Sequence, residues 1–261
     1  MSKPILGIIG GGQLGSMLAA AAKKINIKTV IFCDDPDAPG QKFSDEFICG
    51  KYDDQNAIDQ FINAVDIITF EFENIPYETL KKINNVKPVV PHPSINKIVQ
   101  NRLTEKDFLN KLNIRTTQYT SVNNLKDIFS NENLIPGLLK TCTLGYDGKG
   151  QYKINSIKEL TNENINFNNK YILEKLVKLK KEISVIITRF KDEKCEIYEP
   201  IENTHEDQIL KHSKIPADIN ENILEQSKKW SKMIAEELKY IGTLCVEFFI
   251  DKNDNLYVNE I

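Results

Sequence analysis

The sequence predicts an α/β protein in which an N-terminal parallel sheet is followed by an α+β region. Residues 5–9 and 29–33 are near-continuous apolar runs, as in strands that are buried on both faces of a parallel sheet. An alanine-rich helical pattern lies between these runs at residues 16–24, which is the order of a β-α-β unit. Beyond residue 116, shorter predicted strands and one long amphipathic helix indicate the α+β region.

Composition excludes several classes of protein. The 261 residues suffice for one large domain or two modest ones, and the net charge of −3 provides no broad attraction to nucleic acid or to an anionic membrane. No apolar stretch approaches the roughly 20 residues of a membrane helix, and the early first strand leaves no room for a signal peptide. Five scattered cysteines without a C-x-x-C pair favour reduced thiols. We therefore expect a cytoplasmic protein that binds neither nucleic acid nor membranes.

A glycine-rich turn follows the first predicted strand. Gly10, Gly12 and Gly15 precede the helical pattern, and Asp34 or Asp35 ends the second strand about 20 residues later. This spacing matches the dinucleotide-binding fingerprint, in which a pyrophosphate lies at a helix N-terminus. A nicotinamide-dependent oxidoreductase is therefore one interpretation, although a single G-x-G-x-x-G is a weak signal.

Acidic residues follow another predicted strand, at residues 65–70. In an open α/β sheet, ligands bind beyond the carboxyl ends of the strands, so Gln13, Glu71 and Glu73 are expected in one crevice. Carboxylates at that place suit a substrate with amines or ribose hydroxyls. For Glu73 the alternative is a capping role before a helix at residues 77–83.

Prolines mark the end of the first domain. Residues 89–94 look like its last strand, and the boundary is expected near residues 95–97, which gives domains at 1–96 and 97–261. A helix is expected to open at Arg102. Residues 116–181 are predicted to form a small α+β lid whose first strand is 116–120.

The lid contains a lysine followed by a glycine-rich loop. Lys140 ends a short apolar run, and the loop G-Y-D-G-K-G-Q occupies residues 145–151. Three glycines allow backbone N–H groups to approach an anion, and Lys140 and Lys149 add the point charges that hold phosphate oxygens. The loop is neither a Walker A loop nor a protein-kinase loop. It is expected to act as a flap that closes over a nucleotide.

The last two predicted strands carry a pair of acids. Strands at 244–250 and 256–261 flank a turn, and if Ile250 opposes Tyr257, Glu247 lies opposite Glu260. Like charges at that position repel, whereas a hard cation between them would make a normal magnesium site together with phosphate oxygens. The alternative is that the two acids are unrelated.

Further strands are expected between the lid and this hairpin. Residues 182–189 and 195–200 are predicted strands, and residues 202–207 are expected to form a loop that carries His205. An amphipathic helix that packs on the core is indicated by apolar or small residues at helical spacing, Ile223, Ser227, Trp230, Ile234 and Leu238.

Several of these segments resemble those of a known superfamily. The nucleotide site of ATP-grasp proteins is similar to Lys140, residues 145–151, residues 174–177 and Glu182. With residues 10–15 and 70–74 included, the whole chain resembles the 5-(carboxyamino)imidazole ribonucleotide synthase family of purine biosynthesis. The resemblance implies a Rossmann-like pre-ATP-grasp domain followed by an ATP-grasp domain. Members of the family continue past residue 261 into a C-terminal domain, so the chain is expected to lack that domain.

The resemblance also implies a reaction. ATP phosphorylates bicarbonate to carboxyphosphate, which carboxylates 5-aminoimidazole ribonucleotide and leaves ADP and phosphate; Mg2+ bridges the nucleotide phosphates. Family members are commonly dimers. Three alternatives stay open: a formate-dependent glycinamide ribonucleotide transformylase, the nicotinamide-dependent oxidoreductase, and a non-catalytic ATP-binding fragment.

The site residues that the resemblance implies fall into three sets. The substrate set faces aminoimidazole ribonucleotide and consists of Gln13, Leu14, Glu71 and Glu73. The catalytic set is Lys140, Glu247 and Glu260, of which the two glutamates are the metal ligands. The ATP set is Arg102, Lys140, Gly145, Tyr146, Asp147, Gly148, Lys149, Gly150, Gln151, Glu174, Lys175, Leu176, Val177, Glu182, His205, Asn259 and Glu260.

Overall fold

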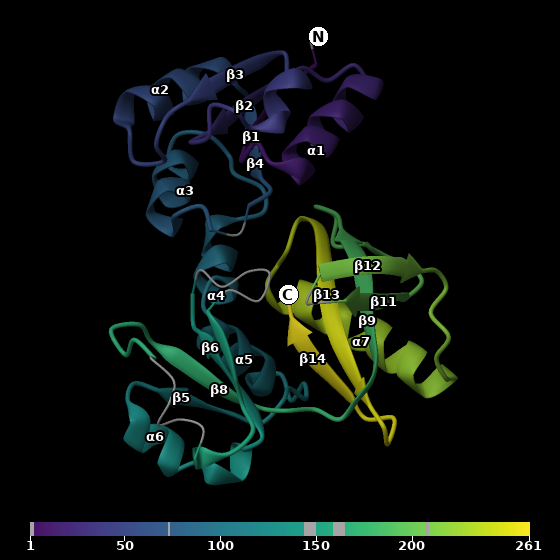
Figure 1. Cartoon of the computed structure of the whole chain (residues 1–261). Helices are drawn as coiled ribbons and strands as arrows, with labels where there is room; N and C mark the ends of the chain where they lie inside the picture. The colour runs from purple at the N-terminus through teal and green to yellow at the C-terminus, as the bar shows by residue number, and fades with distance from the viewer. Residues whose placement is uncertain (1–2, 73, 144–149, 159–164, 207–208) are drawn as a thin grey trace. The chain divides into compact units, whose positions relative to one another are not determined.

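A computed structural model of the protein describes residues 3–72, 74–143, 150–158, 165–206 and 209–261. The chain forms two compact units, Met1–Lys97 and Ile98–Ile261, and Figure 1 labels most of their helices and strands. No helix within the described ranges is both long enough and apolar enough to cross a membrane. Residues 145–149 of the expected flap at 145–151 and the substrate residue Glu73 lie outside the described residues.

The first unit is built on a four-stranded parallel sheet in the order β3-β2-β1-β4. Its strands are β1 (Leu6–Ile9), β2 (Thr29–Cys33), β3 (Glu46–Cys49) and β4 (Ile67–Phe70). Its helices are α1 (Gln13–Lys24), α2 (Gln55–Ala64) and α3 (Tyr77–Asn84), with 3-10 turns at Pro39–Lys42 and Pro93–Ile95. The boundary between the units falls within a short helix, α4 (Asn96–Val99). The parallel sheet that the sequence predicts is confirmed, with β3 as an additional strand.

The expected strand at residues 89–94 is wrong. Only Val89 pairs with the sheet, in an isolated bridge to Ile68, and the chain turns directly afterwards. Pro91 and Pro93 explain the difference, because proline has no N–H to donate to a ladder.

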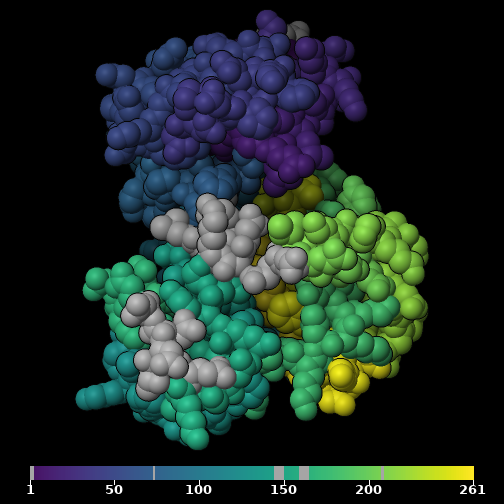
Figure 2. Space-filling view, in the orientation of Figure 1, coloured from purple at the N-terminus to yellow at the C-terminus, as the bar shows by residue number. Residues whose placement is uncertain are grey.

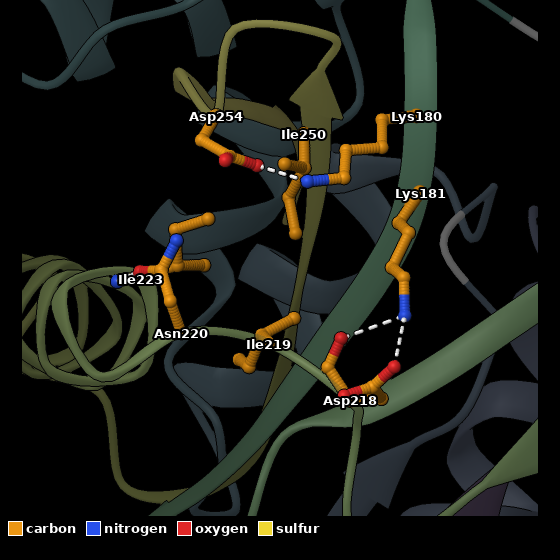
Figure 3. A pocket seen from close by; sticks show the side chains of 8 residues that line it. All are labelled: Lys180, Lys181, Asp218, Ile219, Asn220, Ile223, Ile250 and Asp254. Carbon is orange, nitrogen blue, oxygen red and sulfur yellow. Dashed lines mark hydrogen bonds and ion pairs between the residues drawn. The ribbon is translucent and has the colours of Figure 1, made fainter.

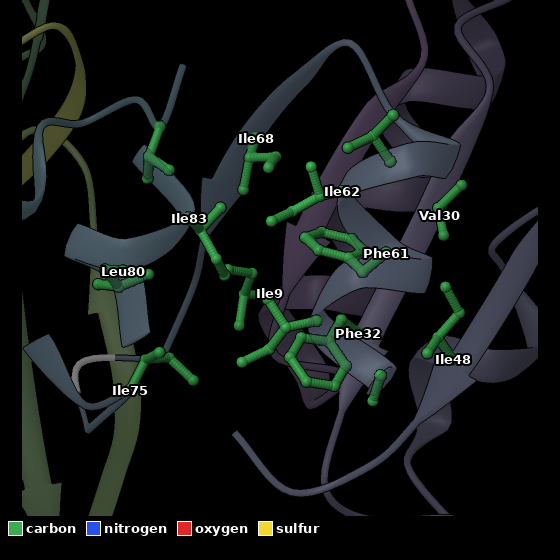
Figure 4. Close-up of a cluster of buried hydrophobic side chains, with 14 residues drawn as sticks. Ile9, Val30, Phe32, Ile48, Phe61, Ile62, Ile68, Ile75, Leu80 and Ile83 are labelled. Atoms are coloured by element: carbon green, nitrogen blue, oxygen red, sulfur yellow. The ribbon is translucent and has the colours of Figure 1, made fainter. Parts of the chain in front are cut away.

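Helices cover both faces of this sheet. Figure 4 shows the larger core, in which side chains of β1 and β2 such as Ile9 and Phe32 pack against Phe61 of α2 and Leu80 of α3. The adjacent residues of the same strands, including Ile8, point to the opposite face and pack against α1. Burial on both faces accounts for the near-continuous apolar runs in the sequence.

The second unit contains two antiparallel sheets. One has the order β12-β11-β9-β13-β14, with β10 also paired to β9. Its strands are β9 (Leu179–Arg189), β10 (Cys195–Ile197), β11 (Ile201–Glu206), β12 (Ile209–Lys214), β13 (Gly242–Asp251) and β14 (Leu256–Glu260). The helix α7 (Glu221–Glu237) buries Ile223, Ser227 and Ile234, as its spacing predicts. The edge strand β12 is exposed along its whole length and is visible at the surface in Figure 2.

The other sheet of the second unit has the order β5-β8-β6-β7. Its strands are β5 (Tyr119–Val122), β6 (Gly137–Thr141), β7 (Gln151–Ile154) and β8 (Tyr171–Lys175); the nearby helices are α5 (Arg102–Lys111) and α6 (Leu125–Phe129), with a 3-10 turn at Glu132–Leu134. The first strand begins at Tyr119 rather than at residue 116. Thr116 instead makes an isolated bridge to Val258 of β14, which ties this segment to the edge of the larger sheet.

Removal of the Phe61 ring tests the core of the first unit. Phe61 is fully buried and packs against the Phe32 ring at a centroid distance of 5.5 Å. We expect Phe61→Ala to lower the free energy of unfolding of this unit by about 3–5 kcal/mol, because it removes buried apolar area and leaves a cavity. Urea unfolding followed by circular dichroism measures the change. The half-exposed Phe43 provides the matched control, and Phe43→Ala should cost about 0.5 kcal/mol or less. This description of the core would be contradicted if both variants lost the same amount of unfolding free energy.

Candidate active site

Glu247 of β13 and Glu260 of β14 face each other across the last hairpin. The register assumed from the sequence is wrong, because Ile250 pairs with Leu256 and not with the residue after it. A β-bulge then adds one residue to β14, Asn259, and brings Glu260 opposite Glu247. In an unbroken ladder Glu247 would face Asn259, and Glu260 would point to the other side of the sheet.

The two carboxylates repel each other. Burial raises the pKa of Glu247, and the charge of Glu260 raises it further, whereas a hydrogen bond from Asn259 lowers it. Asn259 Nδ2 also donates to Glu260 Oε1 at 3.3 Å, and Arg102 Nη1 donates to Glu260 Oε2 at 2.8 Å. The positive side chain of Arg102 therefore offsets part of the negative charge of the pair.

This pair has the chemistry of a partial magnesium site. Carboxylate and amide oxygens are the donors that Mg2+ prefers, and Mg2+ usually takes its other ligands from water and substrate phosphates. A divalent cation would also cancel the repulsion between Glu247 and Glu260. Within the described ranges, no group of three or more His, Cys, Asp or Glu residues is arranged to hold a metal ion.

Glu182 and His205 lie near the same pair of acids. Ser184 is the cross-strand partner of Glu247, so Glu182, two residues before it on β9, lies on the same face of the sheet. His205 Nδ1 contacts Glu182 Oε2 at 2.8 Å, and both side chains influence the pKa of Glu247. His205 belongs to the strand β11, next to a bulge, and not to a loop as the sequence suggested. Four strands thus present polar side chains to one region.

A second cluster centres on the buried carboxylate of Glu174. This side chain on β8 is 3% exposed. Its oxygens lie 3.5 Å from Lys106 Nζ and 3.4 Å from Lys140 Nζ, and Thr117 Oγ1 donates to it at 3.0 Å. Burial alone would raise the pKa of Glu174, but the charges of Lys140 and Lys106 and the Thr117 bond together lower it to about 2. Glu174 is therefore ionised, and one positive charge of the two lysines is left in excess.

Lys106 is a site residue that the sequence did not indicate. It is 1% exposed, and its Nζ also donates to the backbone carbonyl of Asn259 at 3.3 Å. Its position four residues after Arg102 on α5 places both cations on one face of the helix. That spacing was visible in the sequence, but a lysine on a charged helix most often faces solvent.

The described end of the glycine loop, at Gly150 and Gln151, is held by the lid sheet. Gly150 has a φ of +71°, and a side chain there would approach Thr141 Oγ1 to 2.8 Å, so glycine is required. Gly150 O accepts from Thr141 N at 3.0 Å, and Gln151 pairs with Lys140. The described end of the loop is therefore anchored beside Lys140, whereas Gly145 to Lys149 lie outside the described residues.

Residues 174–177, which the family resemblance implies contact the adenine edge of ATP, begin in the last two residues of β8. The N–H groups of Lys175 and Leu176 donate to the carbonyls of Gln118 and Pro136 at 2.8 and 2.9 Å. A contact with an adenine edge therefore has to come from other backbone atoms of residues 174–177. The Glu174 side chain is turned inward to the two lysines and is not available to a base.

In the first unit, Glu71 lies on the glycine-rich turn. Its Oε1 accepts from Gly12 N at 3.1 Å. Burial raises the pKa of Glu71, and bonds from the Gly12 and Gly15 N–H groups lower it in part. Gly10 has a φ of +105°, and a side chain there would meet Glu71 Oε1 at 2.7 Å. Gln13 and Leu14 are exposed at the start of α1.

Comparison with known proteins gives a consistent family. Residues 2–100 match the ribonucleotide synthetase preATP-grasp domain, and residues 107–261 match the ATP-grasp domain. The N5-carboxyaminoimidazole ribonucleotide synthase of Staphylococcus aureus strain MRSA252 is 38% identical over 260 residues, which cover 98% of this chain and 69% of that protein. The chain belongs to the N5-carboxyaminoimidazole ribonucleotide synthase family.

Solved structures of this family agree with the fold. The synthetase from Staphylococcus aureus complexed with ADP aligns with a TM-score of 0.92 and 36% identity. An ADP complex of another N5-carboxyaminoimidazole ribonucleotide synthetase aligns with a TM-score of 0.93 and 34% identity. Each alignment covers 98% of this chain and 69% of the solved chain. The α/β fold expected from the sequence, a preATP-grasp sheet followed by an ATP-grasp domain, is confirmed.

The predicted residues of this family member fall into two groups in the second unit. The first contains the acids of β13 and β14 with their neighbours, Arg102, Glu182, His205, Glu247, Asn259 and Glu260. The second contains Lys140 and Glu174. Lys106 links the groups, because it contacts both Glu174 and Asn259. Their roles toward a nucleotide stay predictions.

Neutralisation of Glu174 tests the second group. Glu174→Gln leaves two buried lysines without their shared counter-charge, so we expect a loss of about 3 kcal/mol of unfolding free energy at neutral pH. Urea unfolding followed by fluorescence of Trp230, the single tryptophan, reports on this unit. A second substitution, Lys106→Met, should restore part of the loss.

The difference in unfolding free energy between the original chain and Glu174→Gln should change with pH in one direction. The pKa of Glu174 is about 2 in the folded chain against an ordinary value of 4.5, so its stabilisation is present above pH 4.5 and is lost as the pH falls toward 2. The original chain and Glu174→Gln should therefore become more similar in unfolding free energy as the pH falls through that interval. A gap that widens with acidification would contradict the ionised, paired state of Glu174.

Proposed function

We propose that this chain uses ATP to carboxylate 5-aminoimidazole ribonucleotide with bicarbonate in purine biosynthesis. Bicarbonate is phosphorylated to carboxyphosphate, the exocyclic amine of the ribonucleotide is carboxylated, and ADP and phosphate leave. Membership of the synthase family supports the reaction. The observation that carries it at the level of this chain is the facing pair Glu247 and Glu260.

The nucleotide is proposed to bind in the second unit. The excess positive charge of Lys106 and Lys140 attracts phosphate oxygens in a region shielded from water, where the attraction is strong. Arg102 adds a guanidinium, the side-chain type suited to bidentate phosphate contacts. Glu182 can accept hydrogen bonds from ribose hydroxyls, and His205 orients Glu182 through their 2.8 Å contact.

The same site fits magnesium. Glu247 and Glu260, with the amide of Asn259, would hold the ion against the phosphates. When bound there, the ion would neutralise charge on the transferring phosphoryl group. Without it, the repulsion between the two carboxylates would extend to the phosphates as well, so a nucleotide free of metal should bind weakly.

The substrate residues are proposed in the first unit. Gln13 and Leu14 are exposed, and Glu71 offers a partly buried carboxylate beside the glycine-rich turn. Such a group suits the amine and hydroxyls of aminoimidazole ribonucleotide. The homodimer, which only the family resemblance implies, and the cytoplasmic location stay predictions.

Release of ADP tests the proposed reaction. With MgATP, 5-aminoimidazole ribonucleotide and bicarbonate, we expect ADP and phosphate in equal amounts, well above the rate when either acceptor is omitted. Glycinamide ribonucleotide with formate serves as the comparison pair and should give no increase. Stimulation by that second pair alone would replace the proposal with the formate-dependent reaction, and binding of ATP without any turnover would leave a nucleotide-binding chain.

The substitution Glu247→Gln distinguishes an effect on the stability of the chain from an effect on ligand binding. Glu247→Gln removes the repulsion with Glu260 and the cost of burying a charge, so the thermal midpoint of the free chain should stay the same or rise. Calorimetric affinity for MgADP should fall about tenfold or more, because the number of charged ligands sets metal affinity. Exposed Glu196 on β10 provides the control, and Glu196→Gln should change neither quantity. Unchanged MgADP affinity in Glu247→Gln would contradict the assignment.

A further inference from the structure

Three residues of α5 contact the last two residues of β14 and the residue that follows them, Ile261. Arg102 Nη1 donates to the Glu260 carboxylate at 2.8 Å. Lys106 Nζ donates to the carbonyl of Asn259 at 3.3 Å, and the N–H of Ile261 donates to Glu105 Oε1 at 2.8 Å. The helix therefore contacts the strand end through one side chain and two backbone groups.

Glu105 and Lys106 are almost completely buried, at 2% and 1% exposure. Charged side chains are rarely buried to this degree without a specific partner. Burial and the charge of Glu260 raise the pKa of Glu105 above its ordinary value. An apolar side chain would pack at this position without these electrostatic costs, but it could not accept the Ile261 N–H.

The segment that these residues hold is the one displaced by the bulge. Beyond Val258 the regular ladder with β13 is interrupted, and only the Glu247–Glu260 pair follows. The orientation of Asn259 and Glu260 is therefore not set by ladder hydrogen bonds alone. A support on the other side of β14 is needed to keep Glu260 beside Glu247 against their mutual repulsion.

We propose that Glu105 is a positioning residue, which holds the Ile261 N–H and thereby keeps Asn259 and Glu260 in place to bind the metal-bound nucleotide. The proposal rests on the proposed function of the Glu247–Glu260 pair. Lys106 completes the support from the next position on the helix. Because Lys106 also contacts Glu174, and Glu174 contacts Lys140, one helix sets both the acid pair and the phosphate-binding lysine.

Calorimetric titration with ADP, in the presence and absence of Mg2+, tests the proposal on the full chain. The ratio of the two dissociation constants measures how much the metal ion improves binding. In Glu105→Met, which keeps the side-chain volume but cannot accept a hydrogen bond, we expect this ratio to fall about tenfold, as for the loss of an outer partner of a metal ligand. Affinity for ADP without metal should change little.

Two further variants make the comparison specific. Glu105→Gln keeps an oxygen that accepts the Ile261 N–H, so it should restore the ratio. Lys111→Met changes an exposed charge on the same helix and should leave the ratio unchanged. A purely structural role would instead weaken ADP binding with and without metal alike in Glu105→Met, and that result would overturn the proposal.

Amide hydrogen exchange of the original chain provides a test that needs no variant. The Ile261 N–H should exchange slowly without any ligand, although it lies after the last residue of β14. Fast exchange at Ile261 would overturn the positioning role whether or not Glu105→Met folds. If the original chain binds no ADP, the proposed function fails, whereas a normal metal-dependent gain that persists in Glu105→Met refutes only the role of Glu105.

Discussion

The second unit depends on one buried carboxylate, that of Glu174. Removing such a group from water is costly, and the two lysines and the Thr117 hydroxyl around it make the ionised form favourable. Because Lys106 lies on α5 and Lys140 on β6, this single group fixes the distance between a helix and two strands. The lysines exceed it by one charge, so the interaction that stabilises the fold also leaves a positive charge for an anion.

The contact between the two acids is repulsive, unlike the contacts of Glu174, so the surrounding structure has to hold these acids together. Glu247 and Glu260 repel each other, and the hairpin alone, in its regular register, would separate them to opposite faces of the sheet. The bulge at Asn259 reverses this, and the contacts of α5 hold the result in place. The proposed cation would relieve the repulsion that these contacts hold in place. By contrast, the cavity of about 420 Å³ in Figure 3 has its lysines already satisfied: Lys180 contacts Asp254 at 2.6 Å, and Lys181 contacts Asp218 at 3.3 Å. A ligand is therefore not needed in this cavity to neutralise the two lysines.

Sequence patterns predicted the strands with clear apolar runs and missed strands that bury few residues, such as β3 and β12. The doubly buried β1 and β2 were evident as apolar runs, whereas β3 has only one fully buried residue, Ile48, and was missed. For the site, the facing of Glu247 and Glu260 was predicted from a register that is off by one residue, and the bulge that corrects it leaves no mark in composition. Lys106 was not found, because only the tertiary structure shows that its face of α5 is turned inward.

The first unit shows why a fingerprint has to be tested against its surroundings. Gly10, Gly12 and Gly15 have the spacing of a dinucleotide site, whose pyrophosphate needs the free N–H groups at the start of α1. Here the carboxylate of Glu71 already accepts from the Gly12 N–H and interacts with that of Gly15. A pyrophosphate would have to displace this carboxylate and would meet a negative charge at close range. The glycines instead allow Glu71 to approach the backbone, since any side chain at Gly10 would collide with it. The turn thus favours a substrate that donates hydrogen bonds to a carboxylate, and it disfavours a nicotinamide dinucleotide.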